Sequence, residues 1–168
     1  SDVVILCLGL DETIEGEEGD DGNQYFSGDK ANLDFPGRQQ YLMEQVVAVG
    51  KPVILVVGSG SALSLNYPSE YCQGIIQAWY PGSHGGDALA NILFGKVSPM
   101  GRLPITIYKD SDRIPPFTDY SMKGRTYRYI EEDALYPFGF GLTYNKSTIE
   151  NLIIEDEIIK DQPLELQV

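Results

Sequence analysis

The sequence predicts an α/β fold: a three-layer sandwich in which a mostly parallel sheet is covered by helices on both faces, followed by an irregular tail rich in Tyr, Pro and Gly. Two observations predict the sandwich. Strand-length apolar runs alternate with helix-like segments, and the runs are continuously apolar, as strands buried on both faces are. The length of 168 residues, with 42% hydrophobic and 22% charged residues, suits one domain with a real core.

The first strand and the first helix come early in the chain. Residues 2–9 (DVVILCLG) predict a strand buried on both faces. A long polar stretch follows at 10–35, and Pro36 then stands where a first helical turn tolerates proline. We expect the helix to end at Gly50. Its predicted apolar face consists of Leu42, Val46 and Val49, at helical spacing.

The middle of the chain continues the alternation. Residues 51–58 predict a second strand, and GSGSAL at 58–63 predicts a tight turn after it, because the segment lacks the Lys and Ser/Thr of a phosphate-binding loop. Residues 74–80 predict a third strand. A short helix is expected at 87–95 and a fourth strand at 102–108.

The pattern changes from Lys109 onward. The stretch at 109–144 is rich in Pro, Gly and Tyr, and it predicts an ordered, extended tail because so many aromatic residues are unusual in a disordered linker. Residues 148–168 contain two short alternating strands, which resemble the start of a separate β module. The chain opens directly on a strand-like segment, which suggests that it begins inside a larger protein.

Composition excludes several classes of partner. With 25 acidic and 12 basic residues, the net charge of −13 argues against nucleic acid and anionic membranes, and no apolar stretch reaches the ~18–20 residues of a membrane span. Cys7 and Cys72 lie in or beside apolar runs and are expected to be buried free thiols. His84 is the single histidine, so we expect no zinc site and no cofactor.

The acidic segment after the first strand is the most suggestive feature. In open α/β sheets, ligands bind at the carboxyl ends of the strands. Crowded carboxylates raise one another's pKa, and glycosidic bond cleavage requires an acid that is partly protonated near neutral pH. A solvated acidic loop and a loose cation site are the alternatives; a standard EF-hand is excluded because Gly22 stands where its glutamate belongs. The seven acids are Asp11, Glu12, Glu15, Glu17, Glu18, Asp20 and Asp21.

An aromatic residue also follows the third predicted strand. Trp79 stands before the turn residues Pro81 and Gly82. Its indole could form the floor of a sugar site, or it could simply pack in the core.

With these motifs in order, the chain resembles the C-terminal α/β sandwich domain of glycoside hydrolase family 3. AWYPGSHGGDALANILFGKVSPMGRLPITIY at 78–108 is very close to the family's W-x-P-G-x-x-G-G to G-R-L-P-x-T signature. GLDETIEGEEGD at 9–20 resembles its acidic loop, and 35–57 resembles its L-P-G-x-Q to GKP-V segment. GRTYRY to YPFGFGLTY, at 124–144, resembles its closing tail. The likeness covers about residues 2–145.

The resemblance implies a retaining β-glycosidase whose acid/base glutamate lies on this loop. An alignment without gaps places that residue at Glu17, one inserted residue places it at Glu18, and Glu15 is the third candidate. The loop lacks the Asp-Arg pair that many members have just after the glycine, so the three alternatives stay open. Trp79 is the candidate substrate-binding residue.

The resemblance also implies a division of the chain and its partners. Residues 1–146 would be the sandwich domain and 147–168 the start of a fibronectin-III-like domain. The expected partners are a β-linked glucoside or xyloside and an N-terminal (β/α) barrel of the same protein that carries the nucleophilic aspartate. The rival interpretation is a non-catalytic carbohydrate- or cation-binding domain.

Overall fold

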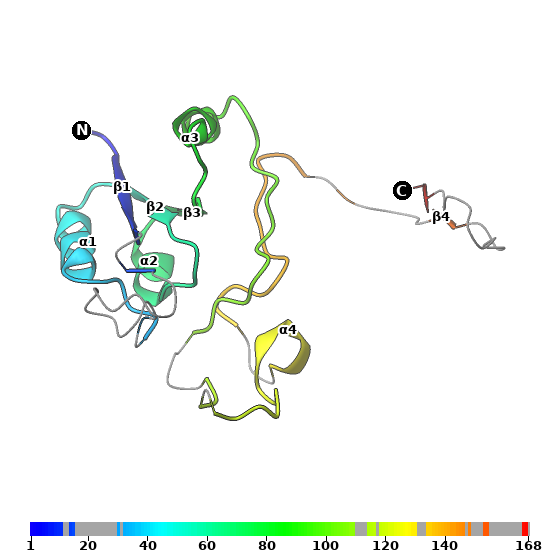
Figure 1. The fold of residues 1–168 in the computed structure, drawn as a ribbon. Helices are drawn as coiled ribbons and strands as arrows, with labels where there is room; N and C mark the ends of the chain where they lie inside the picture. Colours follow the sequence, from blue (N-terminus) through cyan, green and yellow to red (C-terminus); the bar gives the residue numbers. More distant parts are fainter. Residues whose placement is uncertain are drawn as a thin grey trace.

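The centre of the fold is a three-stranded parallel sheet with the order β1-β2-β3 (Figure 1). Its strands are β1 (Val4–Gly9), β2 (Val53–Gly58) and β3 (Gly74–Gln77). The computed structural model describes residues 1–11, 14–15, 30, 32–109, 114–116, 118–130, 134–146 and 148, and the backbone of 153–154 and 166–167.

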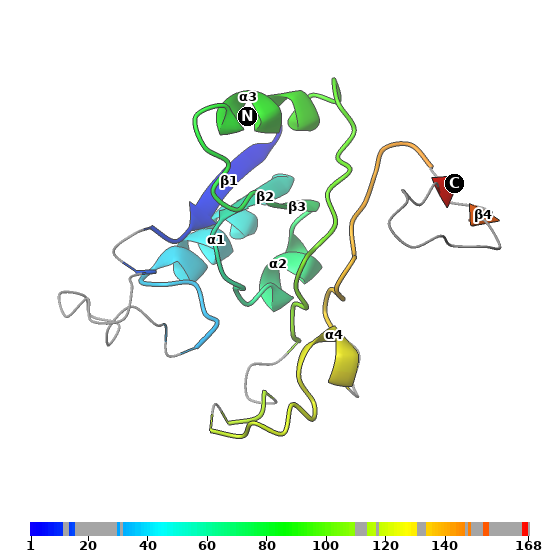
Figure 2. The ribbon, with the colours of Figure 1, turned by 45° about the vertical axis from the view of Figure 1, so that its right-hand side comes forward.

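Helices lie on both sides of this sheet. α1 (Gln39–Ala48) and α2 (Asn66–Tyr71) connect successive strands and lie on one side, whereas α3 (Gly85–Leu93) lies on the other (Figure 2). Two crossovers on the same side follow from right-handed connections between parallel strands that are added in one direction. The arrangement is the predicted α/β sandwich. Among the described residues, no helix is both long and apolar enough to cross a membrane.

The core lies between the sheet and the α1–α2 side. Parallel pairing sets Leu6 beside Leu55 and Leu8 beside Val57, so these four side chains point to one face. Met43 of α1 packs into the same cluster and is fully buried. The buried cluster consists of Leu10, Phe35, Met43, Leu55, Val57, Leu63, Leu65 and Ile107.

The prediction that the first strand is buried on both faces is wrong for β1. Ile5 is 44% exposed, and Cys7 is exposed as well. Both point away from the core face, and β1 pairs only with β2 among the described strands. The expectation that both thiols are buried is therefore wrong for Cys7. Cys72 is half-buried, and burial raises the pKa of its thiol.

The predicted apolar face of the first helix is also displaced. Leu42 is 47% exposed and Val49 is 69% exposed, while Met43 is the fully buried residue of α1. The side chain of Gln39 explains the rotation: its Oε1 accepts from the Gly9 N–H and its Nε2 donates to the Gly9 carbonyl, both at 2.8 Å. This pair of hydrogen bonds turns the side of the helix that carries Gln39 and Met43 toward the sheet.

Two further elements differ from the sequence prediction. α2 was not expected, because its six residues lack apolar periodicity. Residues 102–108 do not form a fourth strand: they run antiparallel to 135–140 with one isolated bridge, between Ile107 and Tyr136. Pro104 has no N–H to donate, which leaves a continuous ladder unavailable there.

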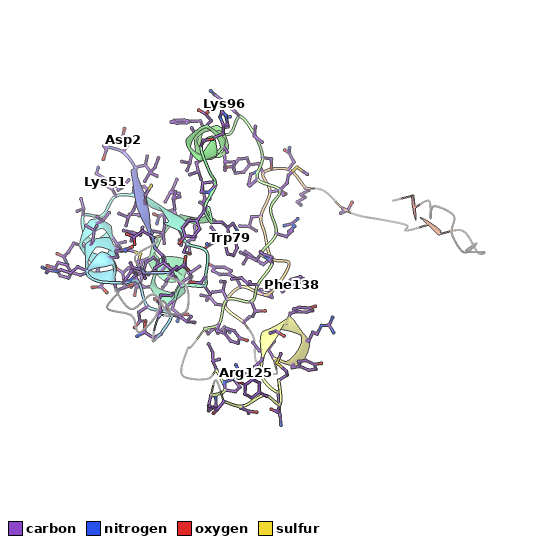
Figure 3. All side chains as sticks on the ribbon, viewed as in Figure 1. Asp2, Lys51, Trp79, Lys96, Arg125 and Phe138 are labelled. Atoms are coloured by element: carbon purple, nitrogen blue, oxygen red, sulfur yellow. The ribbon has the colours of Figure 1, made fainter. Side chains whose placement is uncertain are left out.

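The tail carries its own hydrogen bonds. Arg125 donates to the carbonyls of Pro115, Pro116 and Asp119, and α4 (Thr126–Tyr129) begins directly after it (Figure 3). The rings of Tyr127 and Phe138 stack with centroids 4.4 Å apart. These contacts agree with an ordered aromatic tail over the described residues.

Near the C-terminus, two short strands pair with each other. β4 (Ile153–Ile154) and β5 (Leu166–Gln167) are antiparallel. The division of the chain into a sandwich domain at 1–146 and the start of a β domain at 147–168 stays a prediction.

Gln39→Ala should lower the free energy of unfolding by about 1–3 kcal/mol, because both backbone groups of Gly9 lose their partner. Gln40→Ala is the matched control: among the described residues its amide donates to Glu44 along the helix, and the loss of this bond should cost less than about 0.5 kcal/mol. Urea unfolding followed by circular dichroism measures both. Equal effects of the two substitutions would contradict the role given to Gln39.

Candidate active site

The three parallel strands end at one edge of the sheet, where the acidic loop begins. β1 and β2 approach closely there: a Cβ on Gly9 would lie 1.8 Å from the carbonyl oxygen of Gly58, and Gly9 has a φ of 155°. Only glycine fits this position. The N–H of Leu10 then donates to the Gly58 carbonyl at 2.8 Å, and the Leu10 side chain is buried. The first residue of the loop is thus fixed on the sheet.

A tight turn brings Glu15 back over the same edge. The N–H groups of Ile14 and Glu15 both donate to the carbonyl of Asp11, at 3.0 and 3.1 Å. Ile14 packs against the buried core cluster. The apolar contact of Ile14 and the two backbone bonds together determine where the Glu15 side chain starts.

The Glu15 carboxylate accepts hydrogen bonds from the ends of both other strands. Its Oε2 accepts from the Gly60 N–H at 3.2 Å and from the Tyr80 hydroxyl. Its Oε1 accepts from the Ser61 hydroxyl. Gly60 and Ser61 follow β2, and Tyr80 follows β3, so one carboxylate connects all three strand ends.

Gly60 makes room for this cluster. A Cβ at that position would lie 2.9 Å from Cε2 of Tyr80 and 3.1 Å from Oε2 of Glu15. Any other residue would therefore push the phenol or the carboxylate away.

Lys30, which belongs to the polar stretch at 10–35, reaches the same turn. Its Nζ donates to the carbonyl of Ala62 at 3.1 Å, and its charge attracts the carboxylates of Glu15 and Asp34. Burial lowers the pKa of Lys30, and both carboxylates oppose that shift. Glu15 and Lys30 thus both bind the 60–62 turn, although 14 residues separate them in sequence.

These surroundings favour the ionised form of Glu15. Partial burial by itself raises the pKa of its carboxyl, but the hydrogen bonds from Ser61, Tyr80 and Gly60, with the charge of Lys30, lower it overall. Partial burial and the bond to Glu15 raise the pKa of Tyr80 to about 12. The phenol therefore stays protonated, and remains a donor, throughout the neutral range.

The structure describes one of the three predicted acid/base candidates. Glu15 lies at the carboxyl edge of the sheet, as expected, whereas Glu17 and Glu18 lie outside the described residues. Trp79 lies two residues after the end of β3 and is half-buried (Figure 3). Its contact with sugar stays a prediction.

Sequence reasoning missed the hydroxyl donors Ser61 and Tyr80. Their places in the sequence could have predicted them, because both residues follow predicted parallel strands and therefore lie at the edge of the sheet where the acidic segment begins. The turn at 58–63 was interpreted only as a tight connection, and Tyr80 only as a neighbour of Trp79.

Within the described part of the chain, no group of three or more His, Cys, Asp or Glu side chains could hold a metal ion. His84 lies exposed before α3, with its Nδ1 3.4 Å from a carboxylate oxygen of Asp87.

The profile of the glycosyl hydrolase family 3 C-terminal domain matches residues 1–144. The chain belongs to this family. The match covers the whole sheet, the edge that carries Glu15 and the tail. The family 3 resemblance drawn from the four sequence segments is confirmed.

Similar proteins support the family 3 membership. A xylan 1,4-β-xylosidase of Xylanibacter ruminicola is 44% identical over 153 residues, which cover 90% of this chain and 18% of that protein. A β-glucosidase structure from Erythrobacter marinus is 39% identical with a TM-score of 0.69, over 85% of this chain and 19% of that one. The β-D-glucoside glucohydrolase of Trichoderma reesei is 28% identical with a TM-score of 0.77, over 91% and 23%. The 168-residue chain thus spans about a fifth of the length of these relatives.

Glu15→Gln should destabilise the chain more at about pH 7 than at about pH 3. Because the folded-state pKa of Glu15 is depressed, its ionised form stabilises the fold above the unfolded-state pKa. That stabilisation is lost as the pH falls through the folded-state pKa. Urea unfolding of both proteins at the two pH values measures it, and Glu70→Gln controls for the loss of a negative charge. The prediction would be contradicted if the difference in free energy of unfolding between wild type and Glu15→Gln were equal at both pH values or larger at about pH 3.

Proposed function

We propose that this chain is the acid/base-bearing domain of a retaining, exo-acting glycoside hydrolase that releases non-reducing terminal β-D-glucosyl or β-D-xylosyl residues. The observation that supports it most directly is the position of the acidic loop in a family 3 domain: the bonds of Glu15 hold the start of this loop at the carboxyl edge of the sheet, two and three residues before Glu17 and Glu18. The names of the similar proteins, a β-xylosidase, a β-glucosidase and a β-D-glucoside glucohydrolase, support the two sugar classes.

The chemistry needs two carboxyl groups about 5–5.5 Å apart. In the first step, a carboxyl group of the acidic loop gives its proton to the glycosidic oxygen while a second carboxylate attacks the anomeric carbon. The C–O bond breaks, and the leaving alcohol keeps the proton. Water then attacks the anomeric carbon, the loop carboxylate takes the proton of that water, and the bond to the second carboxylate breaks.

We assign the proton-transfer role to Glu17, with Glu18 and then Glu15 as the alternatives, and the nucleophilic role to an aspartate of an N-terminal (β/α) barrel in the same protein. The edge position of Glu15 supports a site shared between two domains, because its carboxylate is only partly buried and can meet groups from outside the sheet. Trp79, next to Tyr80, would form part of the floor under the sugar.

In the longer enzyme, alanine at the true acid/base should slow hydrolysis of substrates with poor leaving groups by about 10²–10⁴-fold, and azide should partly restore the rate. The measurement compares Glu15→Ala, Glu17→Ala and Glu18→Ala, each with and without azide. Glu44→Ala, on the surface of α1, is the control and should behave like the wild type. No response to azide in any of the three loop variants would place the acid elsewhere.

The 168-residue chain alone should not hydrolyse nitrophenyl β-glucoside or β-xyloside, because it lacks the nucleophile that the proposal places in the barrel. Release of nitrophenol by the purified chain, abolished in the Glu15→Ala, Glu17→Ala and Glu18→Ala triple variant, would contradict the division of roles. Sugar binding by the chain, combined with an inactive longer protein, would instead support a non-catalytic carbohydrate-binding role.

A further inference from the structure

The surroundings of the Glu15 carboxylate suit a permanent anchor rather than a proton donor. Its Oε1 accepts from the Ser61 hydroxyl, and its Oε2 accepts from the Gly60 N–H and the Tyr80 hydroxyl. Although partial burial alone raises the pKa of this carboxyl, the three donors and the charge of Lys30 lower it overall. A group that protonates a glycosidic oxygen needs the opposite surroundings, which keep a carboxyl protonated near neutral pH.

The backbone of Glu15 is held at the same edge of the sheet as its carboxylate. The N–H groups of Ile14 and Glu15 donate to the Asp11 carbonyl at 3.0 and 3.1 Å, and the Ile14 side chain packs against the core cluster. The N–H of Leu10, four residues earlier than Ile14, donates to the carbonyl of Gly58 at the end of β2. Both ends of the Glu15 side chain therefore have a determined position.

The phenol that binds this carboxylate is constrained from two sides. Trp79 has a φ of 56°, in the left-handed region that a bulky residue adopts only under constraint. This conformation turns the chain after β3. The Tyr80 ring comes to lie across Gly60, where a Cβ would lie 2.9 Å from Cε2 of the ring. The phenol is thus a donor of fixed place rather than a surface side chain that happens to touch Glu15.

The Ser61 hydroxyl is also presented by a connected set of hydrogen bonds. The hydroxyl of the buried Ser59 donates to the Ser61 carbonyl at 2.8 Å. Gln77, the last residue of β3, donates through Nε2 to both the carbonyl and the hydroxyl oxygen of Ser59 at 3.2 Å. The turn after β2 is therefore bonded to the end of β3, and the carboxylate of Glu15 binds a rigid part of the sheet edge.

Chain connectivity carries this determined position to the residues that follow. Glu17 and Glu18 stand two and three residues after Glu15. Since an extended chain spans at most about 3.6 Å per residue, their α-carbons lie no more than about 7 and 11 Å from that of Glu15. Proton transfer needs a hydrogen-bonded geometry, and a displacement of about 1 Å at a reacting group can cost about 10²-fold in rate. The place at which the chain leaves Glu15 therefore matters for the acid that follows it.

We propose that Glu15 is a positioning residue: its ionised carboxylate, bound at the sheet edge, holds the start of the acidic loop and thereby places the proton-transferring glutamate at position 17 or 18. This inference rests on the proposed function, in which that glutamate performs the proton transfer. Glu15 itself stays ionised and exchanges no proton with substrate or water. The acidic loop thus divides its carboxyl groups between two tasks, one that anchors and one that changes its protonation state.

A first experiment tests the anchor without relying on activity. Hydrogen exchange of the Ile14 and Glu15 amides is measured by nuclear magnetic resonance in the 168-residue chain, in wild type, Tyr80→Phe and Ser61→Ala. Loss of either donor should speed the exchange of both amides about fivefold or more, because their turn loses a bond to the sheet. Tyr41→Phe is the matched control, because Tyr41 is 52% exposed and Tyr80 54%, and it should leave both rates unchanged. Unchanged rates in both test variants would overturn the inference.

The second experiment compares two leaving groups in the longer enzyme. In Glu15→Gln, kcat/KM for a phenyl β-glycoside should fall about tenfold or more, while kcat/KM for the dinitrophenyl β-glycoside should change less than about twofold. The reason is that only the poorer leaving group needs a proton from a well-placed acid. Glu44→Gln, on the surface of α1, removes the same charge and should leave both values unchanged. A folding defect alone would lower both values by the same factor.

Azide distinguishes an anchor from the acid itself. It should not restore the rate of Glu15→Ala, because the carboxyl group that transfers the proton is still present in that variant. Restoration by azide, or equal losses for the two leaving groups in Glu15→Gln, would overturn the inference while the proposed function stands. If both amides exchange faster as expected but the wild-type longer protein cleaves no β-glycoside, the proposed function fails together with the placing role, and only the anchor on the sheet stands.

Discussion

The carboxylate of Glu15 is the one group that connects the ends of all three parallel strands. Its own chain leaves β1, and its donors follow β2 and β3. Two glycines allow these strand ends to come together. Gly9 lets the backbones of β1 and β2 lie close to each other at Gly58, and Gly60 leaves room for the phenol of Tyr80. An ionised carboxylate is a stronger acceptor than a neutral one, so the protonation state of Glu15 determines how firmly the edge is held.

The same arrangement has consequences for the acidic segment. Glu15 binds Gly60 and Ser61, and Lys30 binds the neighbouring Ala62, so two residues of the polar stretch at 10–35 are bound to one short turn. The opposite charges of Glu15 and Lys30 attract each other. These bonds hold Glu15 and Lys30 at the carboxyl edge of the sheet.

The sequence predicted the elements that a local pattern of residues marks, and it missed the features that depend on contacts between particular distant side chains. Continuous β-branched runs predicted all three strands, and Gly50 and Gly95, both with positive φ, correctly marked the ends of α1 and α3. The helix face centred on Leu42 was wrong because the bond between Gln39 and Gly9, 30 residues apart, sets the rotation of α1. The hydroxyls around Glu15 were missed for the same reason: Ser61 and Tyr80 stand 46 and 65 residues away, and only the parallel strand order brings them together.

The Tyr80 phenol lies across Gly60 and binds the Glu15 carboxylate, and the meeting of the three strand ends depends on this contact. Nuclear Overhauser effects between the ring protons of Tyr80 and the α-protons of Gly60 test it most directly in the 168-residue chain. The structure predicts strong effects, because a Cβ in place of an α-proton of Gly60 would lie 2.9 Å from Cε2 of Tyr80. Their absence from a well-assigned spectrum, with the Tyr80 ring contacting only solvent, would show that the phenol does not bind the Glu15 carboxylate.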